Sequence, residues 1–324
     1  MSTIRSDSVC PICGKTAYIQ YADLYDDRYG FPDTFGLHHC PSCGHRYIAG
    51  SFEPDFLRKL YTDYYPRSSY DLAAHRPHQA IGKLKAWLTG ARALAFRWVP
   101  KDVRVLDIGC GFGETLGYHR ARGCDVYGVE ADENILRVAE RCGYNVHAGL
   151  FDPSLYEADF FDYVTMDQVI EHVNDPVETL RGVEKVLKPG GTLVLSTPNA
   201  EGLGARILGH RWVNWHIPYH QHFFSRASML AAAEKAGLEL SSSRSITHAA
   251  WLYYQWVHLL TRPDPGIASS FWSPGARNSI STKICIKLLR LTHYSLFNHI
   301  VARIVDVFGR GDNRIFILRK KLSL

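Results

Sequence analysis

The pattern of apolar and polar positions changes at about residue 103. From there, short apolar runs alternate with segments whose apolar residues recur every three or four positions, as expected of strands that alternate with helices. This alternation predicts an α/β fold with a doubly wound, mostly parallel seven-stranded sheet. The predicted strands are 103–108, 125–130, 144–148, 161–166, 192–197, 238–246 and 314–319, and the predicted helices are 114–122, 133–142, 176–187 and 226–236.

Other segments add to this sheet domain, which we assign to residues 101–324. Residues 51–100 combine an acidic, aromatic connector with a helical run from about 77 to 98, which we expect to form a lid. An insert at about 247–312 begins with an apolar run too short to span a bilayer and continues as an amphipathic segment. We expect a helical cap over the substrate cleft, with a dimer contact or a membrane-surface contact as alternatives.

Composition and charge narrow the function classes. Of 324 residues, 46% are hydrophobic and 21% charged, as in soluble globular proteins. The chain opens without an apolar signal segment, so we expect a cytoplasmic protein, with a peripheral position at the inner membrane face as an alternative. Residues 261–324 hold eleven Lys or Arg against three Asp, a net +8, which leaves −3 for the rest of a chain of net charge +5. This basic tail favours an acidic partner, such as a sugar nucleotide, a lipid diphosphate, an anionic membrane or RNA, unless it is simply a solvated face.

Four of the eight cysteines form two matched knuckles within a predicted ribbon of residues 1–50. Each knuckle has the sequence C-P-x-C-G, whose spacing presents two thiolates to one tetrahedral Zn²⁺. The glycine lets the turn tighten so that backbone N–H groups can point at the sulfurs. Four thiolates leave no open coordination position, so we expect a structural zinc ion. The expected ligands are Cys10, Cys13, Cys40 and Cys43, with the nearby His38, His39 and His45 as alternative ligands.

The strand at 103–108 runs into a glycine-rich turn, D-I-G-C-G-F-G at 107–113. Glycines there let the backbone approach a ligand that a Cβ would push away. A dinucleotide loop has glycine at the sixth position counted from the first glycine, where this chain has Glu114. That carboxylate would repel a pyrophosphate at the start of the following helix. A positively charged cofactor without phosphates fits better, and Glu130 at the end of the next strand could accept both hydroxyls of its ribose.

These residues resemble the first motif and the ribose-binding acid of the class I S-adenosylmethionine-dependent methyltransferases. The resemblance implies a Rossmann-like methyltransferase fold, S-adenosylmethionine as cofactor and methyl transfer as activity. Ligands bind at the carboxyl ends of the strands in such sheets, so residues just after each strand complete the expected site. An apolar residue at 150–151 would cover the adenine and Asp152 would accept from its amino group. The expected cofactor-binding residues are Asp107, Gly109, Cys110, Gly111, Gly113, Glu130, Ala131, Leu150, Phe151, Asp152, Asp167 and Gln168.

Further segments are similar to a bacterial subgroup of these enzymes that is often associated with polysaccharide or secondary-metabolite sugar modification. The resemblance implies O-methylation of a sugar, a glycoconjugate or another small molecule. An alcohol acceptor needs a base near neutral pH, and histidine suits this role. His220 occupies the histidine position of the P-x-H-x-x-F-F-S pattern and is the first candidate, followed by His222, His172 and His216. The segments similar to this subgroup are the ribbon, Tyr64-Tyr65-Pro66 and residues 218–225, whereas residues 171–176 and 187–199 strengthen the resemblance to the methyltransferases in general.

Three alternatives remain open. Ubiquinone-pathway O-methyltransferases share the E-H-V segment and can hold a divalent cation with an E-x-x-E-H run, but Gln168 stands at its first position here, so we expect no catalytic metal. An RNA methyltransferase would hold phosphates with the ribbon and the basic tail, yet the chain has neither an N-P-P-Y-type segment after the fourth strand nor a Pro-Cys nucleophile, so nucleic acid is not the expected partner. An inactive zinc-anchored scaffold would need neither Asp107 nor Glu130. We therefore expect an acidic small-molecule or saccharide acceptor, free or lipid-linked; one sequence does not give the oligomeric state.

Overall fold

A seven-stranded sheet forms the centre of the computed structural model, which describes residues 8–50, 52–65, 72, 75–273 and 278–322. Its strands are β5 (Arg104–Ile108), β6 (Asp125–Glu130), β7 (Asn145–Ala148), β8 (Phe161–Asp167), β9 (Leu187–Pro198), β11 (Leu238–Ser245) and β12 (Asn313–Lys320). The strand order is β11-β12-β9-β8-β5-β6-β7. The strands from β7 to β9 pair in parallel, whereas β12 is antiparallel to both of its neighbours. The predicted fold class is confirmed.

Helices cover both faces of this sheet because alternate strand residues point to opposite sides. They are α3 (Glu114–Arg120), α4 (Ile135–Cys142), α5 (Pro176–Val186) and α7 (Arg226–Lys235). Leu106 of β5 packs in one buried cluster with Leu180 of α5 and Met229 of α7. The adjacent Val105 packs in a second buried cluster with Leu116 of α3. One strand therefore contributes to two cores, as a doubly wound sheet requires.

Local capping sets the helix boundaries. The Asp175 side chain accepts hydrogen bonds from the backbone N–H groups of Val177 and Glu178 and thereby begins α5. Ser225 and Ser228 form a reciprocal capping box at the start of α7. Gly237, predicted as the stop of this helix, follows it with a φ of +80°.

The N-terminal ribbon is an antiparallel sheet that takes its last strand from the later part of the chain, between α6 and α7. Its strands are β1 (Ser8–Val9), β2 (Thr16–Tyr25), β3 (Thr34–His39), β4 (Arg46–Ile48) and β10 (His222–Phe223). In β10, His222 pairs with Tyr47 and Phe223 with Arg46. The ribbon is thus joined by backbone hydrogen bonds to the segment that holds the candidate catalytic histidines.

The connector and lid region is less helical than its sequence pattern predicts. It contains α1 (Pro54–Lys59), a π-helix at Leu60–Tyr64, α2 (Lys83–Thr89) and two short 3₁₀ helices at Ala91–Ala93 and Ala95–Trp98. The prediction of one helical run from about 77 to 98 is wrong, because Gly90 turns the chain with a φ of +68°. A Cβ at Gly90 would clash with the Thr247 carbonyl oxygen, so the insert packs directly on this turn. Pro66 of the Tyr64-Tyr65-Pro66 segment lies outside the described residues.

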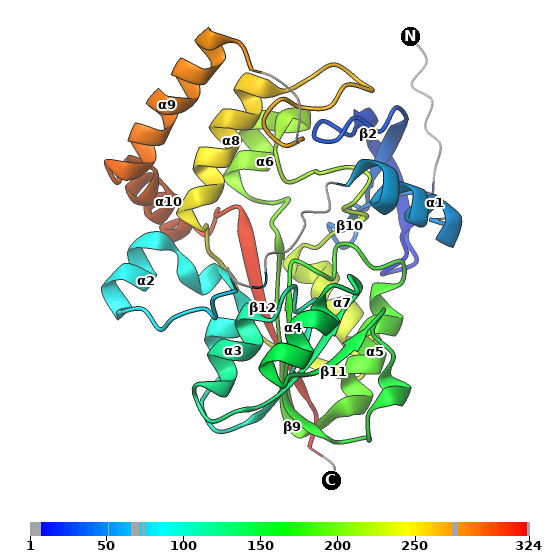
Figure 1. Cartoon of the computed structure of the whole chain (residues 1–324). Coiled ribbons are helices and arrows are strands. Elements are labelled where there is room, and N and C mark those ends of the chain that lie inside the picture. The colour runs from blue at the N-terminus through cyan, green and yellow to red at the C-terminus, as the bar shows by residue number, and fades with distance from the viewer. Residues whose placement is uncertain (1–7, 51, 66–71, 73–74, 274–277, 323–324) are drawn as a thin grey trace.

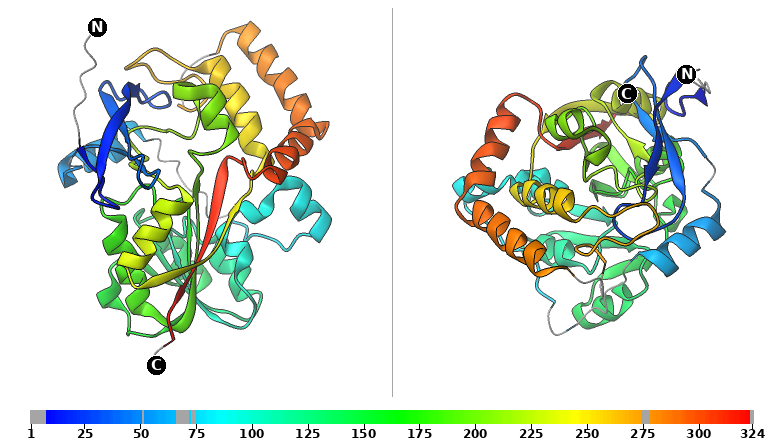
Figure 2. Two further views of the ribbon diagram at one scale, coloured as in Figure 1. Left: turned by 180° about the vertical axis from the view of Figure 1, so that it is seen from behind. Right: turned by 90° about the horizontal axis from the view of Figure 1, so that it is seen from above.

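The insert folds into three helices, α8 (Ala249–Thr261), α9 (Ile280–Tyr294) and α10 (Phe297–Val307), which contact one another pairwise. A short helix, α6 (Leu203–Leu208), precedes them. Figure 1 shows the ribbon and the insert on the same side of the sheet, above the carboxyl ends of its parallel strands, and Figure 2 shows them from behind and from above. In the described part of the chain, no helix combines the length and the apolar character needed to cross a bilayer.

Candidate functional site

The glycine loop between β5 and α3 holds an unusual backbone conformation. Gly109, Gly111 and Gly113 have φ values of +75°, +55° and +81°, which L side chains rarely adopt. At Gly109 a Cβ would clash with Val169, whereas at Gly111 it would meet no atom within 4 Å. The space over Gly111 is therefore open to a ligand, and the loop lies against the segment that follows β8.

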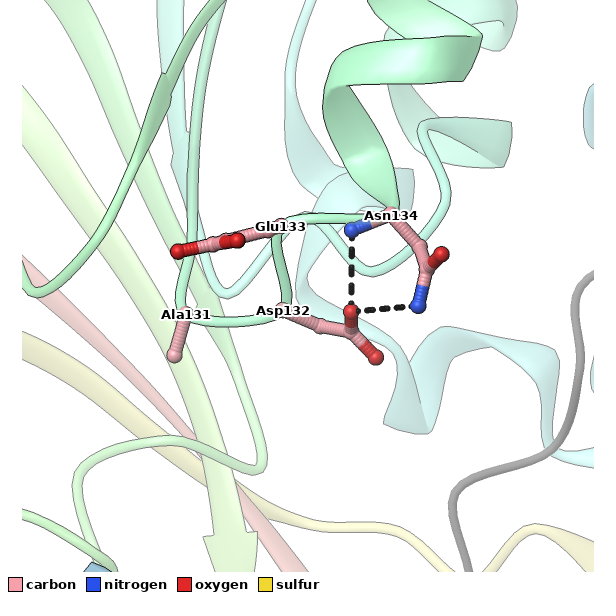
Figure 3. A pocket seen from close by; sticks show the side chains of 4 residues that line it. All are labelled: Ala131, Asp132, Glu133 and Asn134. Carbon is pink, nitrogen blue, oxygen red and sulfur yellow. Dashed lines mark hydrogen bonds between the residues drawn. The ribbon is translucent and has the colours of Figure 1, made fainter.

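Glu130 lies beside this loop in a position that suits a ribose. Its Oε2 accepts a hydrogen bond from the Gly111 N–H at 2.9 Å, and its Oε1 accepts one from the Asp132 N–H at 3.0 Å. Each carboxylate oxygen can accept a further hydrogen bond, as two adjacent ribose hydroxyls would require. The four residues that come after Glu130 in the chain line an open pocket of about 480 Å³ (Figure 3). They are Ala131, Asp132, Glu133 and Asn134. The residues present fit the donor that the sequence implies.

Asp107 is buried beneath the loop, where two hydroxyls engage it. Its Oδ1 accepts from the Thr165 hydroxyl at 2.6 Å, and its Oδ2 accepts from the Thr115 hydroxyl. Burial raises the pKa of Asp107 to about 7. With both oxygens occupied in this way, Asp107 ties β5 to α3 and β8 and so fixes the loop.

Asp167 and Gln168, predicted to contact the cofactor, also have partners within the protein. The Asp167 carboxylate accepts from the Ala95 N–H at 2.7 Å and from the Ser196 hydroxyl, which anchors the lid to the end of β8. The Gln168 amide donates to Ser196 and, at 2.9 Å, to Asn313. Gln168 has a φ of +55°, a strained conformation for a residue with a Cβ.

The remaining residues that were predicted to bind S-adenosylmethionine differ in their exposure to solvent. Cys110 is buried close to Gly128 of β6, and Phe151 packs near Gly182 of α5. The Asp152 carboxylate accepts from the Ser154 N–H at 2.8 Å and begins a 3₁₀ turn. Leu150 is 82% exposed, so its side chain is the one at 150–151 that remains available to cover an adenine.

Three candidate histidines form one cluster: His172 from the segment that follows β8, and His216 and His220 from the segment that precedes β10. The ring centroids of His172 and His220 lie 4.7 Å apart, and those of His216 and His220 lie 4.9 Å apart. Nδ1 of His172 lies 2.9 Å from the Tyr219 carbonyl oxygen, and Nδ1 of His220 lies 2.9 Å from the Asn214 carbonyl oxygen. A carbonyl only accepts, so Nδ1 carries the proton in both rings and Nε2 has a free lone pair.

Burial keeps these histidines neutral. It lowers the pKa of His172 to about 4 and holds the pKa values of His216 and His220 well below the ordinary value of 6.5. His216 also has a φ of +44°, which is strained for this residue type. Tyr29 and Tyr219 contact the His216 ring, and the Tyr61 hydroxyl lies 3.4 Å from Nδ1 of His172. Tyr65 packs on Tyr29 and Tyr219, so these four tyrosines line one side of the cluster.

Glu171 lies at the base of this cluster and is fully buried. Its two carboxylate oxygens have no hydrogen-bond partner of ordinary geometry among the described residues. Burial raises the pKa of Glu171 to about 8, against the smaller effect of the Thr197 hydroxyl, which lowers it. Ligand atoms of Glu171, His172 and His220 lie within 4.8 Å of one another, so these three residues could hold a cation. Gln168 does not join them because its amide is turned toward Ser196 and Asn313.

His222, the second candidate base, lies apart from the cluster. Its Nδ1 lies 3.2 Å from Nε2 of His45, and the two rings stack with centroids 5.4 Å apart. Its backbone belongs to β10, which pairs with the ribbon. This geometry gives His222 a structural position at the junction between the ribbon and the sheet domain.

Arg28 belongs to no recognisable sequence motif and lies in the loop after β2, close enough to His172 and His220 for its charge to act on them. It is 5% exposed, its Nη2 donates to the Val213 carbonyl oxygen at 2.6 Å, and its guanidinium lies 4.4 Å from the centre of the Trp272 ring. Among the described residues no carboxylate lies within 4.0 Å of it and its Nε has no partner. Its charge contributes to the lowered pKa of His172 and His220 after the larger effect of burial.

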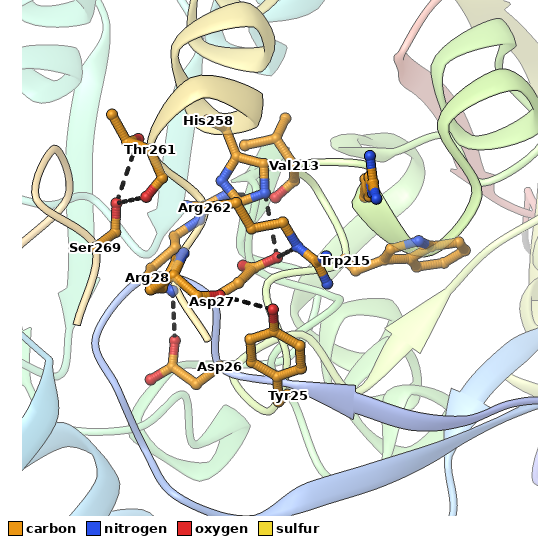
Figure 4. Close-up of polar contacts among 12 residues, drawn as sticks. Tyr25, Asp26, Asp27, Arg28, Val213, Trp215, His258, Thr261, Arg262 and Ser269 are labelled. Atoms are coloured by element: carbon orange, nitrogen blue, oxygen red, sulfur yellow. Dashed lines mark hydrogen bonds and ion pairs between the residues drawn. The ribbon is translucent and has the colours of Figure 1, made fainter. Parts of the chain in front are cut away.

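The two aspartates that precede Arg28 are already engaged. Asp26 accepts from three backbone N–H groups of its own loop, and Asp27 lies 3.1 Å from His258 and 3.5 Å from Arg262 of the insert (Figure 4). Both carboxylates therefore stabilise the loop and its contact with α8. A sequence signal for this arrangement exists only in the charged triplet at 26–28 between aromatic residues.

The four knuckle cysteines converge on one point. The sulfurs of Cys10 and Cys43 lie 3.7 Å apart and those of Cys13 and Cys40 lie 3.5 Å apart, close to the roughly 3.8 Å that tetrahedral Zn–S bonds of about 2.3 Å would impose. All four lie within 4.8 Å of one another. The pKa of Cys10 is lowered to about 5, mainly by its hydrogen bond with the Cys43 thiol and to a smaller extent by hydrogen bonds from backbone N–H groups. The donor set fits a structural zinc ion, and no histidine belongs to it.

Comparisons with known proteins show the family of the chain. Residues 73–243, just over half of the chain, match a family described as a methyltransferase domain. A ubiquinone biosynthesis O-methyltransferase of Xanthomonas axonopodis pv. citri is 30% identical over 170 residues, 48% of this chain and 70% of that protein. One of Thiobacillus denitrificans is 30% identical over 173 residues, 48% of this chain and 75% of that protein. A solved S-adenosylmethionine-dependent methyltransferase of Archaeoglobus fulgidus is 16% identical, covering 83% of this chain and 100% of that one, with a TM-score of 0.43.

Proposed function

Because the chain belongs to the class I S-adenosylmethionine-dependent methyltransferases, we propose that it transfers a methyl group to a hydroxyl of a small acidic acceptor, a sugar or glycoconjugate. The observation that carries the proposal is the cluster of His172, His216 and His220. His172 connects this cluster to the glycine loop, where the methyl donor S-adenosylmethionine would bind. The backbone N–H of His172 donates to the Val169 carbonyl at 2.9 Å, and Val169 lies against Gly109. Donor and acceptor would therefore meet at the carboxyl edge of β5 and β8.

Binding and orientation of the donor fall to a few residues. S-adenosylmethionine, when bound, supplies a sulfonium methyl group that is open to in-line attack. Glu130 would accept the ribose hydroxyls, and the open space over Gly111 would admit the methionine part. Asp107, held by two threonines, keeps the loop in place. Such transfer needs little covalent help, so positioning contributes most of the catalysis.

His220 is the proposed general base. The Asn214 carbonyl holds the proton on Nδ1, and the free lone pair on Nε2 can accept the proton of an acceptor hydroxyl. His172 has the same tautomer and is the second candidate. Both rings are neutral at physiological pH because burial lowers their pKa values, so neither must lose a proton before it acts. The surrounding tyrosine rings would exclude water from the reacting atoms.

Arg28 supports an acidic acceptor. A buried guanidinium without a carboxylate partner is costly, and an anionic group of the acceptor would offset that cost with a charge-assisted hydrogen bond. A carboxylate or phosphate beside the reacting hydroxyl fits this position. Sugar acids and nucleotide-linked sugars carry such groups, whereas a neutral sugar or an uncharged phenol does not.

The experiment that tests this function compares acceptor classes at a fixed S-adenosylmethionine concentration. The purified chain is incubated with a uridine diphosphate hexose, hexuronic acids, a catechol or total RNA, and the products are examined by mass spectrometry for an added methyl group. Transfer to a hydroxyl of a sugar or sugar nucleotide supports the proposal. Transfer to the catechol alone overturns the saccharide class, and transfer to RNA alone overturns the small-molecule function.

The cysteine cluster is proposed to hold a structural zinc ion rather than a catalytic one. Four thiolates would fill a tetrahedral site and leave no position for substrate. The ribbon would then support the acceptor side of the site, since β4 pairs with β10 and the Arg28 loop follows β2.

A further inference from the structure

Helices α9 and α10 expose apolar side chains on the faces that point away from the rest of the molecule. The exposed positions recur every three or four residues on both helices, so each helix carries an apolar stripe on its outer side. Both helices lie at the periphery in all three views (Figures 1 and 2). The stripe residues are Ile280, Ile284, Leu288, Leu291 and Tyr294 on α9 and Phe297, Ile300, Ile304, Val307 and Phe308 at or just after α10, with exposed fractions between 53% and 81%.

The inner faces of these helices are already used, so the outer stripes are not remnants of the core. Both helices pack against α8, and Ala302 and Arg303 of α10 are buried. Arg303 pairs with Asp306 at 2.8 Å and also donates to backbone carbonyls of residues 87 and 247. In an amphipathic helix of a water-soluble domain the outward face is polar. Here an apolar stripe runs along the exposed side of two successive helices.

A stripe of positive charge runs beside the apolar stripe of α9. Lys283, Lys287 and Arg290 are exposed and recur at the same spacing as Ile284, Leu288 and Leu291, displaced by one residue. Between residues 278 and 311 the chain has one carboxylate, Asp306, and it is engaged by Arg303. The hairpin therefore presents three cations and no free anion next to its apolar stripes.

We propose that the α9–α10 hairpin docks on the surface of a bilayer that contains anionic phospholipids. An interfacial helix inserts its apolar stripe at the level of the acyl boundary, while flanking Lys and Arg contact anionic headgroups. Tyr294, Phe297 and Phe308 lie at the ends of the stripes, where aromatic rings favour the membrane interface. A second copy of the chain fits less well, because the one carboxylate on these helices, Asp306, is engaged by Arg303 and is not available to the three cations of a partner.

Docking in this way would orient the acceptor side of the molecule toward the membrane. The insert and the ribbon lie on the same side of the sheet, above the carboxyl ends where donor and acceptor are proposed to meet (Figure 1). The docking itself does not depend on the proposed reaction, and its test needs no acceptor.

The test is co-sedimentation of the zinc-loaded full chain with vesicles of phosphatidylcholine, alone or mixed with phosphatidylserine. We expect binding to the anionic vesicles that weakens with salt, and a loss on the order of 100-fold in Lys283→Gln/Lys287→Gln/Arg290→Gln. Leu288→Gln and Ile304→Gln should each lower binding more than tenfold. Leu136→Gln, at an exposed apolar position of α4 that is 48% exposed, is the matched control and should bind as the unmodified chain does.

The substituted side chains are exposed, so thermal midpoint and S-adenosylmethionine binding should stay unchanged in every variant and report correct folding. Absence of vesicle binding by the unmodified chain would overturn the proposal. So would an equal loss in Leu136→Gln and Leu288→Gln. A dimer that Leu288→Gln converts to a monomer, without vesicle binding, would assign the same face to a second copy and also overturn it.

Discussion

At the scale of single residues, the acceptor side of the site holds several buried polar atoms that lack partners within the described chain. These include both carboxylate oxygens of Glu171, Nε2 of His216, the Tyr219 hydroxyl and Nε of Arg28. Each such atom costs about 1–3 kcal/mol of folding free energy, so their concentration in one place indicates a ligand site. A sequence pattern led to His220, whereas nothing local reveals that Arg28 packs beside Val213, 185 residues away.

His220→Ala should reduce kcat by about 10²- to 10⁴-fold, as expected for loss of a general base. The affinity for S-adenosylmethionine should be unchanged, since His220 does not contact the donor loop. Because burial holds the pKa of His220 well below 6.5, kcat of the unmodified enzyme should stay level down to about pH 6.5 and fall only at more acidic pH. His210→Ala, at an exposed histidine, serves as the control. A kcat fall in the control equal to that in His220→Ala would contradict the assignment.

Arg28→Met should raise KM for an acidic acceptor at least tenfold, because a charge-assisted hydrogen bond contributes about 1.5–3 kcal/mol. Methionine keeps much of the apolar stem of Arg28 and removes the guanidinium that lies over Trp272. Steady-state kinetics with a sugar nucleotide and with its neutral sugar would separate the two roles of the residue. Equal KM changes for both acceptors would point to packing rather than to recognition of charge.

His119 provides a test of the burial effect away from the reacting atoms. It is fully buried on α3, neither ring nitrogen has a partner among the described residues, and burial lowers its pKa to about 4. The unfolded chain therefore binds more protons between pH 6.5 and 4, and the folded state loses stability as pH falls through this range. In His119→Leu the decrease in free energy of unfolding from pH 7 to pH 4.5 should be about 2 kcal/mol smaller. Urea denaturation at both pH values measures it, with His210→Leu as the control; equal pH dependence in His119→Leu and the unmodified chain would contradict it.

At the scale of elements, apolar runs located the seven strands to within a few residues because buried parallel strands are nearly continuous in apolar residues. The lid was harder. Its apolar periodicity suited one helix, but Gly90 and the contact with Thr247 break it into shorter pieces, and both effects depend on tertiary packing. The two-residue strand β10 had no sequence signal, since its partner β4 lies about 170 residues earlier.

Removal of the metal tests the link between the ribbon and the acceptor site. The purified chain should contain one zinc ion, and a chelator should abolish methyl transfer because β10 and the Arg28 loop lose their support. S-adenosylmethionine binding should persist, since its residues lie in the sheet domain. Zinc content by mass spectrometry and calorimetry before and after chelation would establish both. Far less than one zinc per chain, or activity retained without it, would contradict a structural zinc site.

At the scale of the whole molecule, the site lies between three parts that are distant in sequence. The sheet supplies the glycine loop and Glu130, and the loop after β2 of the ribbon supplies Arg28. The segment that leads into β10 supplies His216 and His220. The sheet domain was predictable because its motifs are local. How ribbon and insert meet above it was not predictable, since that arrangement rests on buried contacts such as Asp27 with His258.

The methyl donor and the acceptor are expected to bind at separate, adjoining sites on this chain. Calorimetric titration of S-adenosylmethionine into the unmodified chain, Glu130→Ala, His220→Ala and the exposed control Glu140→Ala tests it most directly. We expect one molecule bound per unmodified chain and unchanged affinity in His220→Ala and Glu140→Ala. Glu130→Ala should lose about 2–3 kcal/mol of binding free energy, roughly 30- to 150-fold in affinity. No binding to the unmodified chain, or an equal loss in His220→Ala and Glu130→Ala, would contradict it.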